Sequence, residues 1–209
     1  SFLEPLRADD DNFLHVYMAG HNFAYTQMNL HFLRKGLRSK AAGKGMSDVQ
    51  ARASALCEAV ERYSGRFQGD EPRRTASARA LGDAALHPNA VMCYSEAQYE
   101  RRSEWNARGS SFQVVPDPFD EDAEIDWTPY WSLSEQRHKY LPTVFSYYSY
   151  PSQANQFFSW AESNGSAAGN TLEEAILQGF FELVERDAVA IWWYNRVRRP
   201  GVDLDSFKE

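Results

Sequence analysis

The sequence predicts a mixed α/β (α+β) fold in which two related halves each contribute an acidic helix. One helical pattern runs from Ser47 to about Tyr63, and a second begins at about Thr171. Between them, aromatic and β-branched runs of strand length occupy 125–134 and 139–150. The two helical patterns end in the same string, E-x-x-E-R, which indicates that the two halves are related.

The composition is that of an ordinary globular protein. The chain has 209 residues, of which 43% are hydrophobic and 24% are charged, and this length is enough for one domain with a real core. With 13 Phe, 11 Tyr and 6 Trp, disorder is not expected. The net charge of −7 argues against nonspecific binding to nucleic acid.

Several sequence features favour a cytoplasmic location. No apolar run approaches the roughly 20 residues that a membrane span requires, so no membrane association is expected. Ser1 is not followed by a cationic region and an apolar region, so no signal peptide is expected. Cys57 and Cys93 do not make a disulfide framework, and no Cys/His spacing resembles a zinc site.

Residues 1–40 are expected to be an N-terminal segment of the same domain as residues 41–209. An acidic stretch lies at 8–12, and a basic segment follows at 31–45. The basic segment fits either a solvated face or a surface for a phosphate or an acidic peptide. It carries five cations and no acid: Arg34, Lys35, Arg38, Lys40 and Lys44.

The first helix is expected to begin at a capping box, with Ser47 at the N-cap and Gln50 at N3, and to run to about Tyr63, with Gly65 as the residue that stops it. Four polar residues fall on one arc of roughly 100°: Ser54, Glu58, Glu61 and Arg62. The apolar residues mostly off that arc are expected to meet a core: Ala55, Leu56, Ala59, Val60 and Tyr63.

The middle of the chain predicts shorter elements. A turn is expected at 69–75, a short helix that ends before Pro88, and another helix from Ser95 to Gly109. The runs 125–134 and 139–150 predict a hairpin with its loop at 135–138, and 157–163 is a candidate third strand. Pro129 and Pro142 place the hairpin strands at an edge or a bulge.

The second helix repeats the stripe of the first at a distance of 124 residues. Aligning the two E-x-x-E-R strings pairs four positions with four: Ser54 with Gln178, Glu58 with Glu182, Glu61 with Glu185, and Arg62 with Arg186. Glu174 lies on the same face of the second helix, within an arc of about 120°.

Each stripe alone is typical of a solvent-facing helix with i,i+3 and i,i+4 pairs. Glu174 has a local explanation too, since Thr171 can be an N-cap with Glu174 as its N3 partner. The repetition favours a site, because facing carboxylates can hold Mg²⁺ and arginines can bind phosphate oxygens. Gly-containing loops at 42–47 and 163–171 precede the helices, whose N-termini attract anions, although neither loop is a Walker A motif.

Together these residues resemble the YcaO family. Its S-x3-E-x2-E-R element corresponds to Ser54, Glu58, Glu61 and Arg62. Its second element, S-x6-E-x3-Q followed by E-x2-E-R, corresponds to Ala167, Glu174, Gln178, Glu182, Glu185 and Arg186, so that alanine stands at the serine position. Strings such as FSYYSYP and SNGSAAGNTLEEAILQGFFELVERD resemble the SagD-like branch, which belongs to thiazole/oxazole-modified peptide (RiPP and bacteriocin) biosynthesis.

The resemblance covers about 41–207, and the chain looks like the N-terminal portion of a YcaO-like catalytic domain whose C-terminal half is absent. It implies a fold whose two halves place the acidic helices around a nucleotide site, with ATP and Mg²⁺ as cofactors. It also implies ATP-dependent cyclodehydration: a Cys, Ser or Thr side chain of a precursor peptide attacks the preceding amide carbon, the oxyanion takes a phosphoryl group from ATP, and loss of phosphate leaves an azoline.

The same resemblance assigns roles to the repeated positions. It implies metal or ribose-and-phosphate contacts for five carboxylates: Glu58, Glu61, Glu174, Glu182 and Glu185. Arg62 and Arg186 are expected to contact phosphate or orient the acids, and Ser54 and Gln178 to be polar nucleotide contacts. Lys44 is a further candidate phosphate ligand, and no residue is assignable as a general base.

Two alternatives stay open at this stage. The same nucleotide chemistry with another nucleophile would give a thioamide or an amidine. A docking scaffold of a thiazole/oxazole synthetase complex would need the fold without the acids. The implied partners are a precursor peptide, a leader-binding partner protein or fused domain, a flavin-dependent azoline dehydrogenase and a second copy in a homo-oligomer.

Overall fold

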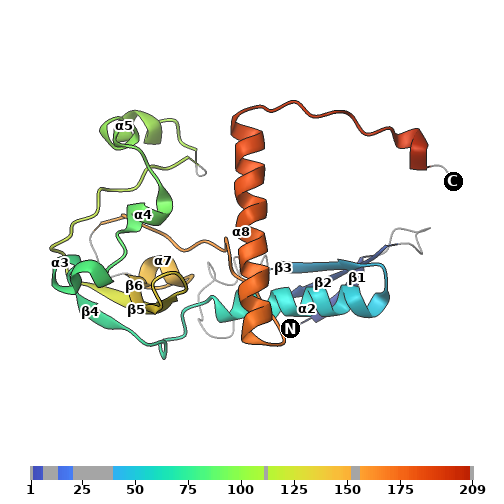
Figure 1. The fold of residues 1–209 in the computed structure, drawn as a ribbon, viewed down its shortest axis with the longest axis horizontal. Coiled ribbons are helices and arrows are strands. Elements are labelled where there is room, and N and C mark those ends of the chain that lie inside the picture. The colour runs from blue at the N-terminus through green and yellow to red at the C-terminus, as the bar shows by residue number, and fades with distance from the viewer. Residues whose placement is uncertain (1, 7–13, 21–39, 111–112, 152–155, 208–209) are drawn as a thin grey trace. The chain divides into compact units, whose positions relative to one another are not determined.

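The computed structural model describes residues 2–6, 14–20, 40–110, 113–151 and 156–207 (Figure 1). The acidic stretch at 8–12 and the cations Arg34, Lys35 and Arg38 lie outside these residues. The chain divides into two compact units, one of residues 1–61 with 164–209 and the other of residues 62–163. The division falls inside one helix, and each unit has its own small sheet, so the expected mixed α/β class is confirmed.

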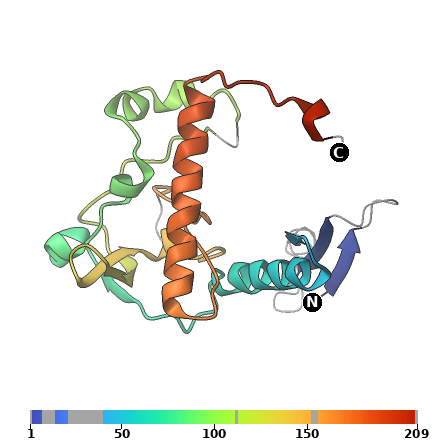
Figure 2. The same ribbon diagram turned by 45° about the vertical axis from the view of Figure 1, so that its right-hand side comes forward.

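The first unit contains a three-stranded antiparallel sheet with a helix along it. The strands β1 (Phe2–Leu6), β2 (His15–Gly20) and β3 (Lys40–Gly45) pair in that order. Helix α2 (Asp48–Ser64), cyan in both views, runs beside these strands (Figures 1 and 2). The same unit contains the long helix α8 (Leu172–Tyr194) and a short 3-10 turn, η3 (Leu204–Phe207).

Small residues determine how α2 meets the sheet. Strand β3 alternates exposed and buried positions, and the buried ones are Ala41, Gly43 and Gly45. A Cβ atom added to Gly43 would lie 2.0 Å from the backbone nitrogen of Ala55 and 2.3 Å from the carbonyl oxygen of Ala51. The backbones of strand and helix are therefore in direct contact, and only glycine fits there.

This contact corrects two expectations. The stretch 42–47 was expected to be a glycine loop, but residues up to Gly45 belong to β3, since the glycines serve helix packing. Ala55 and Ala59 of α2 are buried as expected, together with Ala51. By contrast, Leu56, Val60 and Tyr63 are 46%, 55% and 42% exposed, because a sheet this close accepts only an alanine stripe.

Helix α8 begins as the sequence predicts. The side-chain oxygen of Thr171 accepts a hydrogen bond from the amide of Glu174 at 3.2 Å, which makes Thr171 the N-cap. Gly179 is the buried residue of this helix, and a Cβ there would lie 2.6 Å from the carbonyl oxygen of Gly165. Many of its apolar side chains, Phe180, Phe181 and Trp193 among them, are exposed in the described part of the chain. Within that part, no helix is both long and apolar enough to cross a membrane.

The second unit is built on another antiparallel sheet. Its strands β4 (Arg74–Ala76), β5 (Ile125–Ser132) and β6 (Arg137–Pro142) pair in that order. Trp127 is completely buried at its centre, and its indole nitrogen donates a hydrogen bond to the carbonyl oxygen of Ala76 at 2.9 Å. The predicted hairpin at 125–134 and 139–150 is therefore present, with a different second strand.

Short helices surround this sheet. They are α3 (Ala78–Leu81), η2 (Gly82–Ala84), α4 (Pro88–Met92), α5 (Glu96–Glu100), α6 (Arg102–Asn106) and α7 (Thr143–Ser146). The helix predicted at 95–109 starts at Ser95 as expected, with a capping box to Gln98, but divides at Arg101, whose φ of −98° and ψ of 17° depart from helical values.

Three further expectations for this unit were wrong, and one was confirmed. The end of the predicted turn at 69–75 is part of strand β4, which pairs with β5. Strand β6 stops at Pro142 because Thr143 turns inward and its buried hydroxyl bonds that of Thr128 at 3.1 Å, so that α7 follows. The short helix predicted before Pro88 is present as α3 followed by η2, and Pro88 itself starts α4. The stretch 157–163 forms no strand, and Phe158 instead fills the core beside Trp127.

A polar cluster around Asp126 joins β4 and β5 to the end of the hairpin segment. The carboxylate of Asp126 accepts hydrogen bonds from Thr75 at 2.6 Å and from Tyr150 at 2.8 Å, and it lies 3.5 Å from the guanidinium of Arg73. Thr75 contributes most to the lowered pKa of Asp126. Burial first, and then the bond to Asp126, raise the pKa of Tyr150 to about 12.

Replacing Gly43 by alanine is expected to destabilise the first unit by about 3 kcal/mol, because the new methyl group would overlap backbone atoms that cannot rotate away. Urea denaturation followed by circular dichroism measures the change. The control is Ala42→Ser on the exposed side of the same strand, for which we expect a change below about 0.5 kcal/mol. Equal stabilities for Gly43→Ala and the control would disprove the contact.

The Asp126 cluster is expected to make the free energy of unfolding fall at both high and low pH. The folded state holds the Tyr150 proton more tightly than the unfolded chain, so this stabilisation is complete below the ordinary pKa of 10.0 and is lost as the pH rises to about 12. Asp126 has the opposite sign: its stabilisation is present above 3.8 and is lost as the pH falls through its lowered pKa. Melting temperatures of the wild type and of Tyr150→Phe, measured from pH 9 upward, should converge at the alkaline end. A constant difference across that range would contradict the assignment.

Candidate functional site

The two repeated stripes lie on α2 and α8, as the sequence predicts. On α2, Ser54 and Arg62 are exposed and Glu58 and Glu61 are half-buried. On α8, Glu182 is half-buried and the other four positions of the stripe are exposed: Glu174, Gln178, Glu185 and Arg186. Each helix therefore presents its own acidic face, defined here as the α2 stripe and the α8 stripe.

Glu58 binds the sheet. Its carboxylate accepts a hydrogen bond from the backbone amide of Ala42 at 3.0 Å. Strand β3 is an edge strand of the described sheet, and amides on the open side of an edge strand lack a strand partner. Glu58 thus fastens α2 to β3 through one carboxylate oxygen.

The beginnings of the two helices match at the same 124-residue offset as the stripes. The N-caps are Ser47 and Thr171, whose hydroxyl oxygens accept from the amides of Gln50 at 3.3 Å and of Glu174 at 3.2 Å. The N3 side chains return to the residue before the cap: Gln50 accepts from the amide of Met46 at 2.9 Å, and Glu174 accepts from that of Asn170 at 2.9 Å. The repeat therefore includes the cap as well as the stripe.

Glu174 is engaged at the start of its helix. The same oxygen that accepts from the Asn170 amide also accepts from the Asn170 side-chain amide at 3.0 Å. Asn170 was not among the predicted residues, and an asparagine directly before a T-x-x-E cap is the signal that could have found it. The local capping explanation for Glu174 thus holds in this structure: Thr171 accepts from the Glu174 amide, and Asn170 donates to the Glu174 side chain.

The remaining α8 positions divide into paired and unpaired side chains. Arg186 donates to Glu182 at 3.1 Å across one helical turn, an exposed pair that contributes little to stability. Within the described residues, Gln178 and Glu185 have no hydrogen bond or ion pair to a protein group. They are available to bind an added ligand.

Lys44 lies on the side of strand β3 that faces away from α2. Ala41, Gly43 and Gly45 face α2, whereas Lys44 alternates with them and is exposed on the opposite side of β3. The structure therefore does not group Lys44 with the α2 stripe. Ala167, which stands where the related motif has serine, is half-buried, and its methyl group would lie 3.8 Å from a Cβ on Gly179.

Protein sites for Mg²⁺ differ in how many of the ligands the protein itself supplies. Among the described residues, no three His, Cys, Asp or Glu side chains gather in a group that could hold a metal ion. A closed cage built by the protein alone is therefore not present in that part of the chain. Mg²⁺ is, however, usually held by one or two carboxylates and completed by phosphate and water. Glu58 with Glu61 on α2, or Glu182 with Glu185 on α8, offers such a pair with an adjacent arginine.

Solved structures define the class to which this fold belongs. A heterocyclase in complex with substrate and cofactor is 53% identical over 100% of this chain and 28% of its own, with a TM-score of 0.86. The heterocyclase TruD is 47% identical over 99% of this chain and 28% of its own, with a TM-score of 0.64. The mixed α/β fold is thus that of the heterocyclases.

The family follows from the sequence model that the chain matches. Residues 42–209 match the family described as YcaO cyclodehydratase, ATP- and Mg²⁺-binding, and the chain belongs to the YcaO family. A protein of Methanothermobacter thermautotrophicus is 30% identical over 172 residues, which are 81% of this chain and 38% of that protein. The chain therefore spans between about a quarter and two fifths of the length of these relatives.

The bond between Glu58 and Ala42 can be separated from the charge of Glu58. We expect Glu58→Ala to lower the free energy of unfolding by about 1 to 2 kcal/mol, because the Ala42 amide loses its acceptor. Glu58→Gln retains an acceptor oxygen and should remain within about 0.5 kcal/mol of the wild type. Ser54→Ala, one turn earlier on the same face, is the control and should change nothing. If the alanine and glutamine variants unfold at the same urea concentration, Glu58 does not fasten the helix to the sheet.

Proposed function

We propose that this chain provides a nucleotide-binding part of an ATP-dependent peptide cyclodehydratase. The observation that carries the proposal is the 53% identity, over the whole chain, with a heterocyclase that was solved with its substrate and cofactor. The match of 42–209 to an ATP- and Mg²⁺-binding cyclodehydratase family supports it independently. The proposed substrate is a precursor peptide in which Cys, Ser or Thr residues become azolines.

The proposed reaction joins a side chain to the backbone of the peptide. The thiol or hydroxyl of the substrate residue attacks the carbon of the preceding amide, and the amide oxygen must then leave. ATP, when bound, supplies the phosphoryl group that makes this oxygen a leaving group. Such transfers depend on positioning and on neutralising the phosphate charge, which is why acids with a metal ion and arginines suit the site.

The roles proposed for the stripe residues follow from their partners. Glu61 and Glu185 are proposed Mg²⁺ ligands, together with Glu58, Glu182 and Glu174. Metal binding at Glu174 or Glu182 would replace or share the hydrogen bonds from Asn170 or Arg186. Arg62 and Arg186 are proposed phosphate contacts, and Ser54 and Gln178 polar nucleotide contacts. The proposed phosphate contact of Lys44 has the weakest support, because Lys44 lies on the side of β3 away from α2.

We further propose a cytoplasmic site of action, in keeping with the two free cysteines Cys57 and Cys93. The proposed assembly includes a leader-binding protein or fused domain that delivers the precursor peptide. A flavin-dependent dehydrogenase would act on the azoline product, since azoles require a further two-electron oxidation.

The stripe predicts which carboxylates the reaction needs. Glu61→Gln and Glu185→Gln are each expected to reduce cyclodehydration about 100-fold or more, because removing a charge that faces the transferred phosphoryl group has an effect of this order. Glu173→Gln, next to the stripe on the same helix, is the matched control and should keep wild-type activity. In the assay, the protein is mixed with its leader-binding partner, precursor peptide and Mg²⁺-ATP. The mass of the peptide is then followed by mass spectrometry.

The mass of the peptide distinguishes the candidate functions. Loss of one water per modified residue, dependent on ATP, abolished in the two stripe variants and absent when the Cys, Ser and Thr residues of the peptide are replaced by alanine, is the expected result. An amidine also forms with loss of one water, but that reaction uses an amine and would survive the alanine replacements. In a parallel reaction supplied with sulfide, an exchange of oxygen for sulfur would indicate thioamide formation by the same nucleotide site. An unchanged peptide that still forms a tight complex with all variants would indicate a docking scaffold and overturn the proposal.

A further inference from the structure

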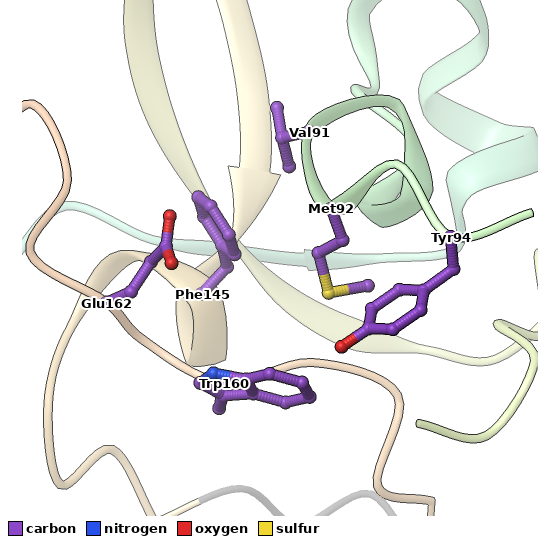
Figure 3. Close-up of a pocket in the computed structure, with 6 residues that line it drawn as sticks. All are labelled: Val91, Met92, Tyr94, Phe145, Trp160 and Glu162. Atoms are coloured by element: carbon purple, nitrogen blue, oxygen red, sulfur yellow. The ribbon is translucent and has the colours of Figure 1, made fainter. Parts of the chain in front are cut away.

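A small cavity in the second unit combines aromatic walls with one acid (Figure 3). Its volume is about 130 Å³, and six residues line it: Val91, Met92, Tyr94, Phe145, Trp160 and Glu162. They come from α4 and the residue pair that follows it, from α7, and from the segment after the sheet. All six belong to the second unit, so the cavity lies within one compact unit.

Aromatic contacts hold the walls in place. Trp160 stacks on Phe157, with ring centroids 5.5 Å apart and an interplanar angle of 9°. Tyr94 meets Trp160 edge to face at 6.4 Å, and its hydroxyl donates to the carbonyl oxygen of Val114 at 2.9 Å. Two aromatic faces and the soft side chain of Met92 thus border a fixed space.

The polar groups of the cavity favour a positive ligand. Figure 3 shows the carboxylate of Glu162 beside the ring of Phe145, at the edge of the space. Glu162 is exposed, and it forms no hydrogen bond or ion pair with a group in the described chain. Burial, then Tyr99 and Glu162, raise the pKa of Tyr94, so its hydroxyl stays neutral and its oxygen can still accept a proton donor. Among the described residues that line the cavity there is no lysine or arginine.

The size and charge of the cavity exclude several ligands. Pockets for drug-sized ligands are usually about 300 to 1,000 Å³, so a nucleotide is too large, and its phosphates would be repelled by Glu162. An apolar side chain would contact the aromatic walls but would gain nothing from the carboxylate of Glu162. A cation on a flexible apolar stem satisfies each wall: the stem contacts Val91 and Met92, the charge lies over the faces of Tyr94, Phe145 or Trp160, and Glu162 balances it.

We propose that this cavity binds the side chain of a lysine or arginine residue presented by a polypeptide. Glu162 is the charge partner and Trp160 the stacking surface. The site is separate from the α2 and α8 stripes and does not depend on the proposed nucleotide chemistry. It would select polypeptides by a basic residue while taking no part in the reaction itself.

The test uses fluorine NMR of the full chain labelled with fluorotryptophan. The chain has six tryptophans, and the Trp160 signal is assigned by its absence in Trp160→Phe. The probe is the blocked tripeptide acetyl-Gly-Lys-Gly-amide, with the arginine peptide as a second probe and the norleucine peptide as a neutral comparison. We expect the lysine or arginine probe to shift the Trp160 signal to saturation while the exposed Trp131 signal stays in place.

Variants of exposed acids make the result specific. Glu162→Gln is expected to weaken probe binding about threefold to tenfold, and Glu162→Lys, which supplies its own cation, to abolish saturation. Glu124→Gln, another exposed acid of the same unit without a hydrogen-bond or ion-pair partner in the described chain, should bind like the wild type.

Three results would overturn the proposal. One is a norleucine peptide that binds as tightly as the basic peptides, which would make the cavity an apolar site. Another is unchanged binding in Glu162→Gln. The third is binding of butylammonium alone as tight as that of the lysine peptide, which would replace the polypeptide by a free amine.

Discussion

The first unit depends on the direct backbone contact between β3 and α2. At Gly43 there is no room for even a methyl group, and the facing residues on the helix are alanines. This closeness brings the carboxylate of Glu58 within hydrogen-bonding distance of the Ala42 amide. A larger pair of surfaces would separate the two backbones by several ångströms, and the acid would then face only solvent. The small residues that let the helix approach the strand therefore also decide where Glu58 of the acidic stripe lies.

The sequence predicted the first helix well and its packing poorly. Its bounds, its N-cap at Ser47 and its polar stripe followed from local patterns, because capping and helical periodicity are local properties. The buried face did not follow, since hydrophobicity ranks Leu56 and Val60 above alanine. Only the distance to the sheet decides in favour of alanine, and that distance is set by glycines on another element.

In the middle of the chain, local sequence patterns also failed to predict the ends of the strands. A run of aromatic and β-branched residues indicated one long strand at 139–150, but a single buried hydroxyl, that of Thr143, bonds Thr128 and ends the strand at Pro142. Strand β4 lacked any pattern of its own, because three residues are too few for periodicity. In the candidate site, the stripe positions were predicted from the repeat and from the resemblance. Asn170 and the amide of Ala42 were found only in the structure, because their hydrogen bonds to Glu174 and Glu58 depend on how the chain is folded.

The shared helix beginnings have a consequence for how quickly backbone hydrogens exchange with solvent. At α2 and α8 the amide before the cap is held by the N3 side chain, neutral in Gln50 and charged in Glu174. A cation that attracts the Glu174 carboxylate would compete with the Asn170 amide for it, whereas Gln50 gives the Met46 amide no such competitor. The two helix starts therefore have the same hydrogen bonds but differ in how they respond to cations. Exchange of the Asn170 amide hydrogen would change with the cations nearby, whereas exchange of the Met46 amide hydrogen would not.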